Sequence, residues 1–389
     1  MSFEIISVIL FLVFLSFVLY RDRKNIEFKT GLIIRRSSRG KAFIYKFAEK
    51  HEKKLRILGL IGILVAFLAS LYGTYLLLKS TYDVFTRKTT ESPLRVVLPS
   101  VEGVSMPGFV LGVPFWYWII SVFVVMLIHE PMHAFMARIE KIDIKSFGLL
   151  IFLVIPGAFV EPNERQLKRK SLIGKLRVFA AGSFGNIVAA GIIFLLILGF
   201  TKVTSIFIQP VGVGFESLIT GSYAESVELR GIITELNGVK IKDLNDFALA
   251  MKDVKPGDDV VVKTDKGKYI IKTISDPDNG QRALVGIQKV YVQYRYAPFI
   301  SNRYVSKNLL SVIDWIDGLF AWMLILNLGV GVFNLFPLKP LDGGLMLEAI
   351  SQHFFKRNGS KISNYISLII LGLILFNLFG PKILSLFKI

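Results

Sequence analysis

Residues 122–137 read VFVVMLIHEPMHAFMA and place His129, Glu130 and His133 within an otherwise apolar run. On a helix, residues four apart lie on one face, so both imidazoles can reach the same metal ion. Imidazole nitrogens suit Zn²⁺, which prefers nitrogen or sulfur donors in a tetrahedral site. Glu130 lies beside them, where its carboxylate can take a proton from a water on the metal. This stretch therefore predicts a zinc site with a general base.

The setting of this motif makes it more specific than its letters alone. His-Glu-x-x-His also occurs by chance, and the alternative here is a pair of core histidines with satisfied hydrogen bonds. However, ionisable side chains inside a membrane helix are costly and by default functional. Pro131 removes a backbone donor and predicts a kink or a widened turn. Such an opening either admits water to the site or is a tolerated membrane-helix proline.

The composition is that of a membrane protein. Of the 389 residues 53% are hydrophobic, and the mean hydropathy of +0.56 is too high for an ordinary soluble protein. The absence of cysteine excludes disulfides and thiolate zinc sites, so zinc must be held by histidine and carboxylate. The net charge of +18 is gathered in short loops between apolar runs, as on the cytoplasmic side of membrane proteins. We therefore expect a lipid bilayer, and no nucleic acid, as a partner.

Apolar runs long enough to cross a membrane lie at 3–20, 57–78, 115–136, 178–200, 315–336 and 365–387. The stretch 21–56 holds thirteen Lys or Arg against four acidic residues, so we expect a solvated cytoplasmic loop. The stretch 79–114 holds four Lys or Arg against three acidic residues and is expected outside. Counting crossings from these loops puts His129 and His133 toward the cytoplasmic end of their helix.

The apolar segment 147–160 is only 14 residues long, which is short for a span, and both its flanks look cytoplasmic. Its Pro-Gly-Ala-Phe-Val sequence, residues 156–160, has turn and strand character. Non-helical backbone at this depth must be covered by protein or line a wet cavity. We therefore expect a membrane-embedded re-entrant strand that lines the site and can pair with an extended substrate.

Residues 201–301 intersperse charges with short alternating strands. Asn237-Gly238 predicts a hairpin-like turn, and Asp243 is expected to cap a short helix that ends near Met251. The pattern indicates a small β-rich domain outside the membrane. It holds no catalytic constellation, so a binding or gating role is expected.

Asp342 is the candidate for the third ligand that a two-histidine zinc site still needs. It follows the proline-rich turn 334–341 and precedes a helix that begins near Leu345; on local grounds alone a helix N-cap is the alternative. The crossing count brings Asp342 to the same cytoplasmic end as His129 and His133. We therefore predict that these three residues hold the metal.

The run 178–200 contains Gly182, Gly185 and Asn186. Small residues let membrane helices approach closely, so both glycines are expected to serve packing. Asn186 is a polar group at helical depth. It either forms a hydrogen bond with a neighbouring helix or points into the site.

The sequence contains three motifs: His129-Glu130-Pro-Met-His133, Gly182-x-x-x-Asn186 and Asn334-x-x-Pro337-x-x-Pro340-Leu-Asp342-Gly343. Together they resemble the site-2 protease family of intramembrane zinc metalloproteases, over roughly residues 115–350. The segment 156–161 looks like the membrane-embedded strand of that family. The insert is similar to a PDZ domain at 211–215, 221–225 and 232–238, with Leu229-Arg230-Gly231 replacing a longer turn.

This resemblance implies hydrolysis of transmembrane segments of other membrane proteins near the cytoplasmic side, as in regulated intramembrane proteolysis. It implies that one Zn²⁺ is the cofactor, that Glu130 is the general base, and that Asn186 and Asn334 orient the substrate or stabilise the oxyanion. The PDZ-like domain would lie outside the cytoplasm and take a peptide ligand.

The expected fold is a polytopic α-helical membrane protein with about six transmembrane helices, a membrane-embedded strand segment and a PDZ-like β-rich domain. Its expected regions are N-terminal helices (1–114), the first half of the zinc-binding core (115–200), the PDZ-like domain (201–301) and the second half of the core (302–389). A metal transporter and an inactive relative that binds membrane segments are the alternatives. A transporter gives Glu130 no role, an inactive relative would normally have lost a ligand or the glutamate, and a PDZ scaffold is weaker than either.

Overall fold

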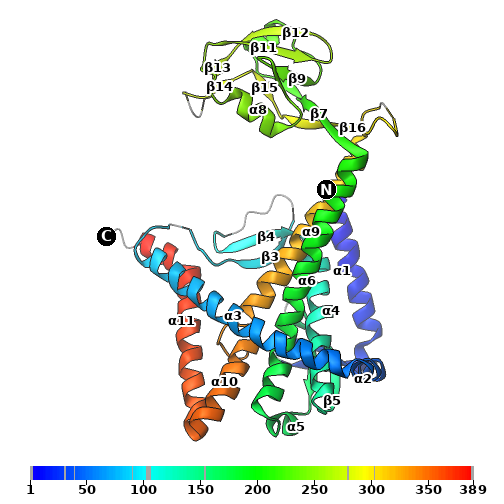
Figure 1. The fold of residues 1–389 in the computed structure, drawn as a ribbon, viewed down its shortest axis with the longest axis vertical. Helices are drawn as coiled ribbons and strands as arrows, with labels where there is room; N and C mark the ends of the chain where they lie inside the picture. Colours follow the sequence, from blue (N-terminus) through cyan, green and yellow to red (C-terminus); the bar gives the residue numbers. More distant parts are fainter. Residues whose placement is uncertain are drawn as a thin grey trace. The chain divides into compact units, whose positions relative to one another are not determined.

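The computed structural model describes residues 3–29, 32–38, 40–89, 91–101, 107–152, 155–277, 280–301 and 303–386. These residues form two compact units (Figure 1). Unit 1 comprises residues 1–196 and 317–389, and unit 2 comprises residues 197–316. Unit 2 is wider than the expected 201–301 insert because it includes the ends of the two helices that flank the insert.

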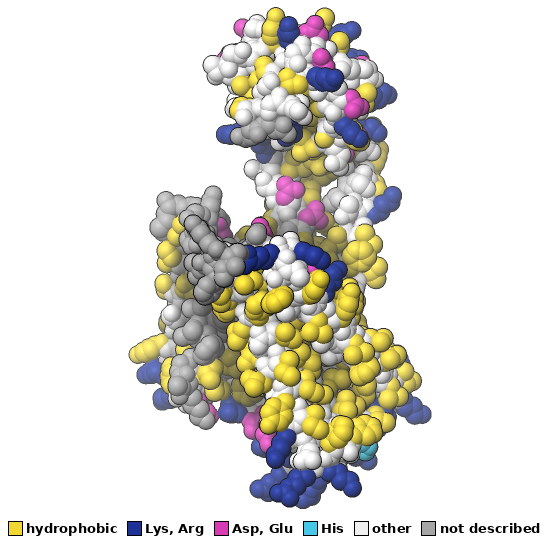
Figure 2. Space-filling view, turned by 90° about the vertical axis from the view of Figure 1, so that its left-hand side faces the viewer, with side chains coloured by type: hydrophobic (Ala, Val, Ile, Leu, Met, Phe, Trp, Pro, Cys, Tyr) yellow, Lys and Arg dark blue, Asp and Glu magenta, His cyan; other side chains and the backbone are white. Residues whose placement is uncertain are grey.

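Among the described residues, six segments are helical, long and apolar enough to cross a membrane, as the sequence predicts. The sixth segment contains two helices, α10 and α11, joined by the short 3₁₀ turn η2 (Lys356–Asn358). Figure 2 shows hydrophobic side chains over these helices and Lys and Arg side chains at their lower end. The helices are α1 (Phe3–Arg21), α3 (Glu52–Phe85), α4 (Phe115–Ile139), α6 (Leu172–Phe207), α9 (Lys307–Phe333), α10 (Asp342–Phe355) and α11 (Gly359–Leu386).

Helix α6 packs closely against α3, α4 and α9, and glycines lie at these helix contacts. A Cβ at Gly185 of α6 would lie 2.7 Å from Cγ of Met132 in α4. A Cβ at Gly62 of α3 would lie 3.0 Å from the ring of Phe184 in α6, and one at Gly331 of α9 would lie 3.1 Å from the Ser183 carbonyl. Small residues thus allow the close helix contacts that drive association in a membrane.

A four-stranded antiparallel sheet lies beside these helices, in the order β1-β2-β5-β6. The expected re-entrant segment forms the hairpin of β5 (Ile144–Phe152) and β6 (Ile155–Pro162). β1 (Ile26–Lys29) and β2 (Leu32–Ser37) extend it, and α2 (Lys41–Lys50) follows.

The expectation of a plain solvated loop at 21–56 is therefore wrong. Although this segment is rich in charged residues, it also contains the apolar Leu32-Ile33-Ile34, which pair with residues 150–152 of β5. Such a pairing satisfies the backbone of both strands, which a charge count does not weigh. The ion pair between Arg36 of β2 and Glu161 of β6 spans the sheet.

Two further elements of unit 1 frame the core. The parallel pair β3 (Val96–Ser100) and β4 (Val110–Pro114) leads directly into α4. The short helix α5 (Glu164–Lys168) follows β6, and the Asn163 side chain caps it. Helix α4 continues through Pro131 without interruption.

Unit 2 is a small β-rich domain. Its sheet has the order β12-β11-β9-β7-β16, with β10 paired to β9. The expected turn joins β9 to β10 with φ of 49° at Asn237 and 83° at Gly238, and Asp243 caps α8 as predicted. Its core is apolar, with Val213, Ile233 and Leu236 fully buried.

The elements of unit 2 are β7 (Ile208–Gly214), β8 (Ser217–Leu218), α7 (Tyr223–Ser226), β9 (Ile233–Leu236), β10 (Val239–Lys240), α8 (Leu244–Met251), β11 (Asp259–Thr264), β12 (Lys268–Lys272), β13 (Ile274–Ser275), β14 (Ala283–Leu284), β15 (Ile287–Gln288) and β16 (Tyr291–Tyr296).

Candidate metal centre

The two histidines of α4 face each other one helical turn apart. Nε2 of His129 lies 3.1 Å from Nε2 of His133. Their side chains are 12% and 16% exposed, so the pair is largely enclosed by protein. The i, i+4 spacing brings the two Nε2 atoms close together, as the sequence predicts for two side chains that share one metal ion.

Asp342 completes the group from the other end of the chain. It is the first residue of α10, and its carboxylate oxygens lie 3.5 Å from Nε2 of His129 and 3.5 Å from Nε2 of His133. The turn before it is tight, because a Cβ at Gly344 would lie 2.4 Å from the carbonyl carbon of Leu338. The Gly343-Gly344 pair thus allows the turn to deliver the carboxylate to the histidines.

The donor set fits a metal ion. One ligand atom from each of His129, His133 and Asp342 lies within 4.8 Å of the others. A Cβ at Gly182 of α6 would come within 2.6 Å of His129 Nε2 and closer still to His133 Nε2. Gly182 therefore leaves free the space next to the ligand nitrogens, a role beyond the packing that the sequence suggested.

Each of these three side chains is oriented by a contact with α6. Nδ1 of His133 lies 2.7 Å from the Val178 carbonyl oxygen, and Ser183 Oγ donates to Asp342 Oδ2 at 2.8 Å. The side-chain amide of Asn186 lies 3.0 Å from Nδ1 of His129. All three partners belong to α6, so one helix aligns the whole group. Such partners fix the ring orientation and the tautomer of metal-binding histidines.

Glu130 is held by the sheet rather than by α6. Its Oε2 accepts a 2.8 Å hydrogen bond from the backbone N–H of Val160 in β6. A cavity of 240 Å³ adjoins this contact and is lined by Glu130, Pro131 and Ala158, among others. The hairpin thus brings a strand edge and a carboxylate together next to the histidines.

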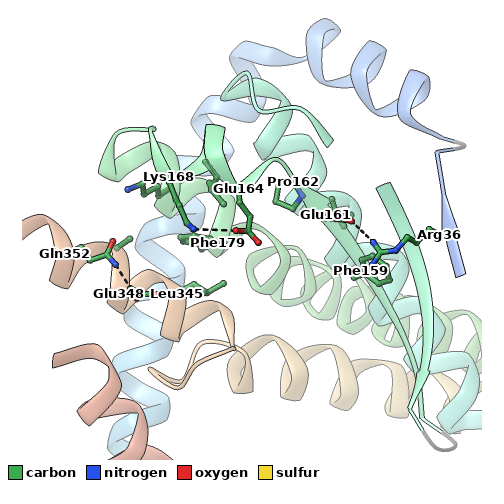
Figure 3. Close-up of a pocket in the computed structure, with 14 residues that line it drawn as sticks. Arg36, Phe159, Glu161, Pro162, Glu164, Lys168, Phe179, Leu345, Glu348 and Gln352 are labelled. Carbon is green, nitrogen blue, oxygen red and sulfur yellow. Dashed lines mark hydrogen bonds and ion pairs between the residues drawn. The ribbon is translucent and has the colours of Figure 1, made fainter. Parts of the chain in front are cut away.

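A larger cavity of 740 Å³ lies between β6, α5, α6 and α10 (Figure 3). Its lining includes Val160, Phe179 and Leu345. Phe179 is next to Val178 in α6, and Leu345 is three residues after Asp342 in α10. Charged side chains surround it, including the pair Lys168–Glu164. A hydrogen bond from Ser146, with Lys145 and Arg36 nearby, holds the pKa of Glu161 at this cavity below its usual range.

The structure brings together four of the six residues singled out in the sequence, and places a fifth beside them. His129, His133 and Asp342 form the metal group, Glu130 is adjacent in α4, and Asn186 contacts His129. Asn334 differs: its side-chain amide donates to the Val330 carbonyl of its own helix. Its backbone carbonyl accepts from Gly343 N–H, so Asn334 supports the turn to Asp342.

The sequence alone did not single out Ser183, and it gave Gly182 of the Gly182-x-x-x-Asn186 motif only a packing role. Both follow from one signal that was available: they lie three and four residues before Asn186, on the same face of α6. The Val160 N–H and the Val178 carbonyl are backbone groups, which no sequence motif specifies.

Three side chains that could hold a metal ion, an adjacent glutamate and helices long enough to cross a membrane are together the features of a multi-pass membrane metallopeptidase. The chain belongs to peptidase family M50, the site-2 protease family, whose model matches residues 117–376. An uncharacterized protein of Methanocaldococcus jannaschii is 28% identical over 354 residues, which cover 89% of this chain and 86% of that protein.

Proposed function

We propose that this protein is an intramembrane zinc endopeptidase that cuts transmembrane segments of other membrane proteins near their cytoplasmic ends. One observation carries the proposal: His129, His133 and Asp342 converge within the C-terminal half of a membrane-length helix, with Glu130 next to them. Two imidazoles and one carboxylate, with no cysteine in the chain, are a donor set suited to Zn²⁺ with an open fourth position.

A zinc ion held by these residues would polarise a substrate carbonyl and lower the pKa of a water molecule. Glu130 accepts the proton of the attacking water and delivers it to the leaving amine. The Val160 N–H fixes one oxygen of the Glu130 carboxylate against β6 without neutralising it. Asn186 and Asn334 are proposed to orient the substrate or stabilise the oxyanion, with Asn186 better placed because it contacts His129.

The substrate is proposed to bind as an extended strand along β6. The Val160 N–H points to Glu130, away from β5, so the backbone groups of Ala158 face the same free edge. Pro156 stands at the next such position, and proline is tolerated in a strand where its missing N–H faces away from the partner. An unwound substrate would exchange its helical hydrogen bonds for pairing with this edge.

Water and the cut ends are proposed to pass through the 740 Å³ cavity, which reaches Val160, Phe179 and Leu345. We place this side in the cytoplasm because exposed bases gather around α5, including Arg165, Lys168 and Arg169. Figure 2 shows Lys and Arg side chains at the corresponding end of the helices.

Unit 2 is proposed to be a PDZ-like, extracytoplasmic binding domain. A cavity of 610 Å³ lies between α8 and residues 281–290, lined by Leu244, Phe247, Met251 and Ala283. An apolar helix beside a short strand is suited to a peptide that adds to the strand edge. The peptide would select or gate substrates rather than take part in hydrolysis.

The test is mass-spectrometric mapping of products when the purified full-length chain, in detergent, meets a panel of single-span proteins. A Glu130→Gln variant that still binds Zn²⁺ is the control. Cuts within the apolar span, near its cytoplasmic end and absent in the control, are expected. A zinc-loaded chain that cuts none of the panel would overturn the proposal in favour of a metal transporter or an inactive relative.

A further inference from the structure

Two buried amide oxygens in unit 1 have no hydrogen-bond partner among the described residues. They are Oδ1 of Asn186 in α6 and Oδ1 of Asn327 in α9, and both residues are 0% exposed. Buried polar atoms in native proteins nearly always form hydrogen bonds, because an unpaired one has lost its hydrogen bonds to water without gaining others. Each oxygen therefore calls for a partner.

Asn327 lies on the face of α9 that packs against α6. Four residues further along α9 is Gly331, whose Cβ would lie 3.3 Å from Cβ of Asn186. Residues four apart share a helix face, and Asn327 and Gly331 are both buried, so Asn327 lies on the same side of α9 as Gly331. Measured along the axis of α9, Asn327 thus lies one helical turn, ~5–6 Å, from the position that contacts Asn186.

The tautomer of His129 decides which end of the Asn186 amide must face it. His129 directs Nε2 at the metal group, since Nε2 is the atom close to both His133 and Asp342. A neutral imidazole that offers the lone pair of Nε2 carries its proton on Nδ1. Nδ1 is then a donor and requires an oxygen.

Turning the Asn186 amide by 180° meets this requirement without moving any other group. The two ends of an amide have the same shape, and the turn puts Oδ1 where Nδ2 lies 3.0 Å from His129 Nδ1. The Nδ2 donor then occupies the buried position that lacks a partner. An acceptor is needed there, and Asn327 Oδ1 is the unpaired acceptor on the facing helix.

We propose that Asn327 is a positioning residue of the metal centre. Its Oδ1 accepts from one buried water, which in turn accepts from Asn186 Nδ2, and this holds Asn186 Oδ1 on the Nδ1–H of His129. Asn327 Nδ2 is itself anchored on the Met323 carbonyl at 2.8 Å. This series of hydrogen bonds thus connects the backbone of α9 to His129 of α4, a proposed metal ligand. This inference rests on the proposed metal site but not on peptide cleavage.

The test measures Zn²⁺ affinity by chelator competition in the full-length chain. Asn327→Leu is expected to weaken binding roughly 10- to 100-fold, as loss of an outer-shell partner does. Asn377→Leu is the matched control: Asn377 is also 0% exposed and also donates to its own helix, at the Leu373 carbonyl, but it lies in α11 and bonds Thr81 of α3. The control is expected to lower stability and leave zinc affinity unchanged.

Two further variants separate positioning from folding. Asn327→Asp, as the neutral acid, keeps both an acceptor oxygen and a donor for the Met323 carbonyl, and is expected to retain affinity within a few-fold. In a double-mutant cycle, adding Asn327→Leu to Asn186→Leu is expected to reduce Zn²⁺ affinity little further, because the two residues act through the same series of hydrogen bonds. The absorption spectrum of Co²⁺, used as a probe metal, is expected to change in Asn327→Leu and not in Asn377→Leu.

Unaltered affinity in Asn327→Leu, or equal losses in Asn327→Leu and Asn377→Leu, would overturn this inference while the metal site stands. Failure of the unmodified chain to bind any divalent ion would instead overturn the proposed function.

Discussion

Ser183 donates a 2.8 Å hydrogen bond to Oδ2 of Asp342, joining α6 to α10 across 159 positions of sequence. Oδ2 is also the oxygen that lies 3.5 Å from His129, while Oδ1 lies 3.5 Å from His133. The hydroxyl therefore sets the rotation of the carboxylate and decides which oxygen faces which histidine. The carboxylate depends on this bond because it is nearly enclosed by protein.

Ser183→Ala is expected to weaken Zn²⁺ binding roughly 10-fold, because the carboxylate loses the partner that orients it. Zinc affinity of the purified protein, measured by chelator competition, checks this expectation. Ser363→Ala provides the control, since Ser363 is equally buried and lies in α11, away from the metal group. Equal affinities for Ser183→Ala and the unmodified chain would show that Asp342 is held by the backbone turn alone.

Gly182→Ala is expected to abolish metal binding, because its Cβ would occupy the space beside both ligand nitrogens. Gly191→Ala, in the same helix, is the control: a Cβ there meets nothing within 4 Å. Since alanine favours a helix over glycine by about 1 kcal/mol, the control should be as stable as the parent or more so. Metal content after dialysis reports the result, and a fully loaded Gly182→Ala protein would contradict the assigned geometry.

Ala158→Pro is expected to slow substrate cleavage while leaving zinc affinity intact. The outward N–H of Ala158 is the donor proposed for an added strand, and proline removes it without breaking a bond to β5. Phe159→Pro is the contrasting variant, because its N–H faces β5 and its loss should destabilise the hairpin. Cleavage rates and thermal unfolding, measured together, separate these cases; an Ala158→Pro enzyme of full activity would exclude strand pairing at this edge.

Glu161→Gln is expected to lower the thermal unfolding temperature at neutral pH and to matter less in acid. The Ser146 hydroxyl, with Lys145 and Arg36, holds the pKa of Glu161 below its usual range in the folded protein. A depressed carboxyl pKa contributes stability above the unfolded value of about 4.3, and this contribution is lost as the pH falls through the folded pKa. The effect should be small because Glu161 is partly exposed. A difference between the two proteins that grows in acid would contradict the assignment.

Some of the fold and site follows from local patterns. The helices are predictable because runs of membrane-length apolar residues have few alternatives in a bilayer. His129 and His133 are predictable as a pair because their spacing matches one turn of a helix. Asp342 required one more step, a count of crossings that brings distant segments to the same side.

Other features depend on pairings that no local pattern carries. Residues 32–37 appear as part of a basic loop, and only the presence of β5 turns them into the second strand of a sheet. Gly182 looks like a packing glycine until the histidines are placed opposite it.

The amino-acid sequence by itself determined the chemistry of this protein: which side chains can hold a metal, which can accept a proton, and which segments can lie in lipid. These properties belong to single residues and to contiguous runs. Tertiary structure alone decided how these side chains are oriented, through the contacts of Ser183 with Asp342, Val160 with Glu130 and Asn186 with His129. Those contacts join residues far apart in the chain, and they depend on helix packing at the scale of a single methyl group.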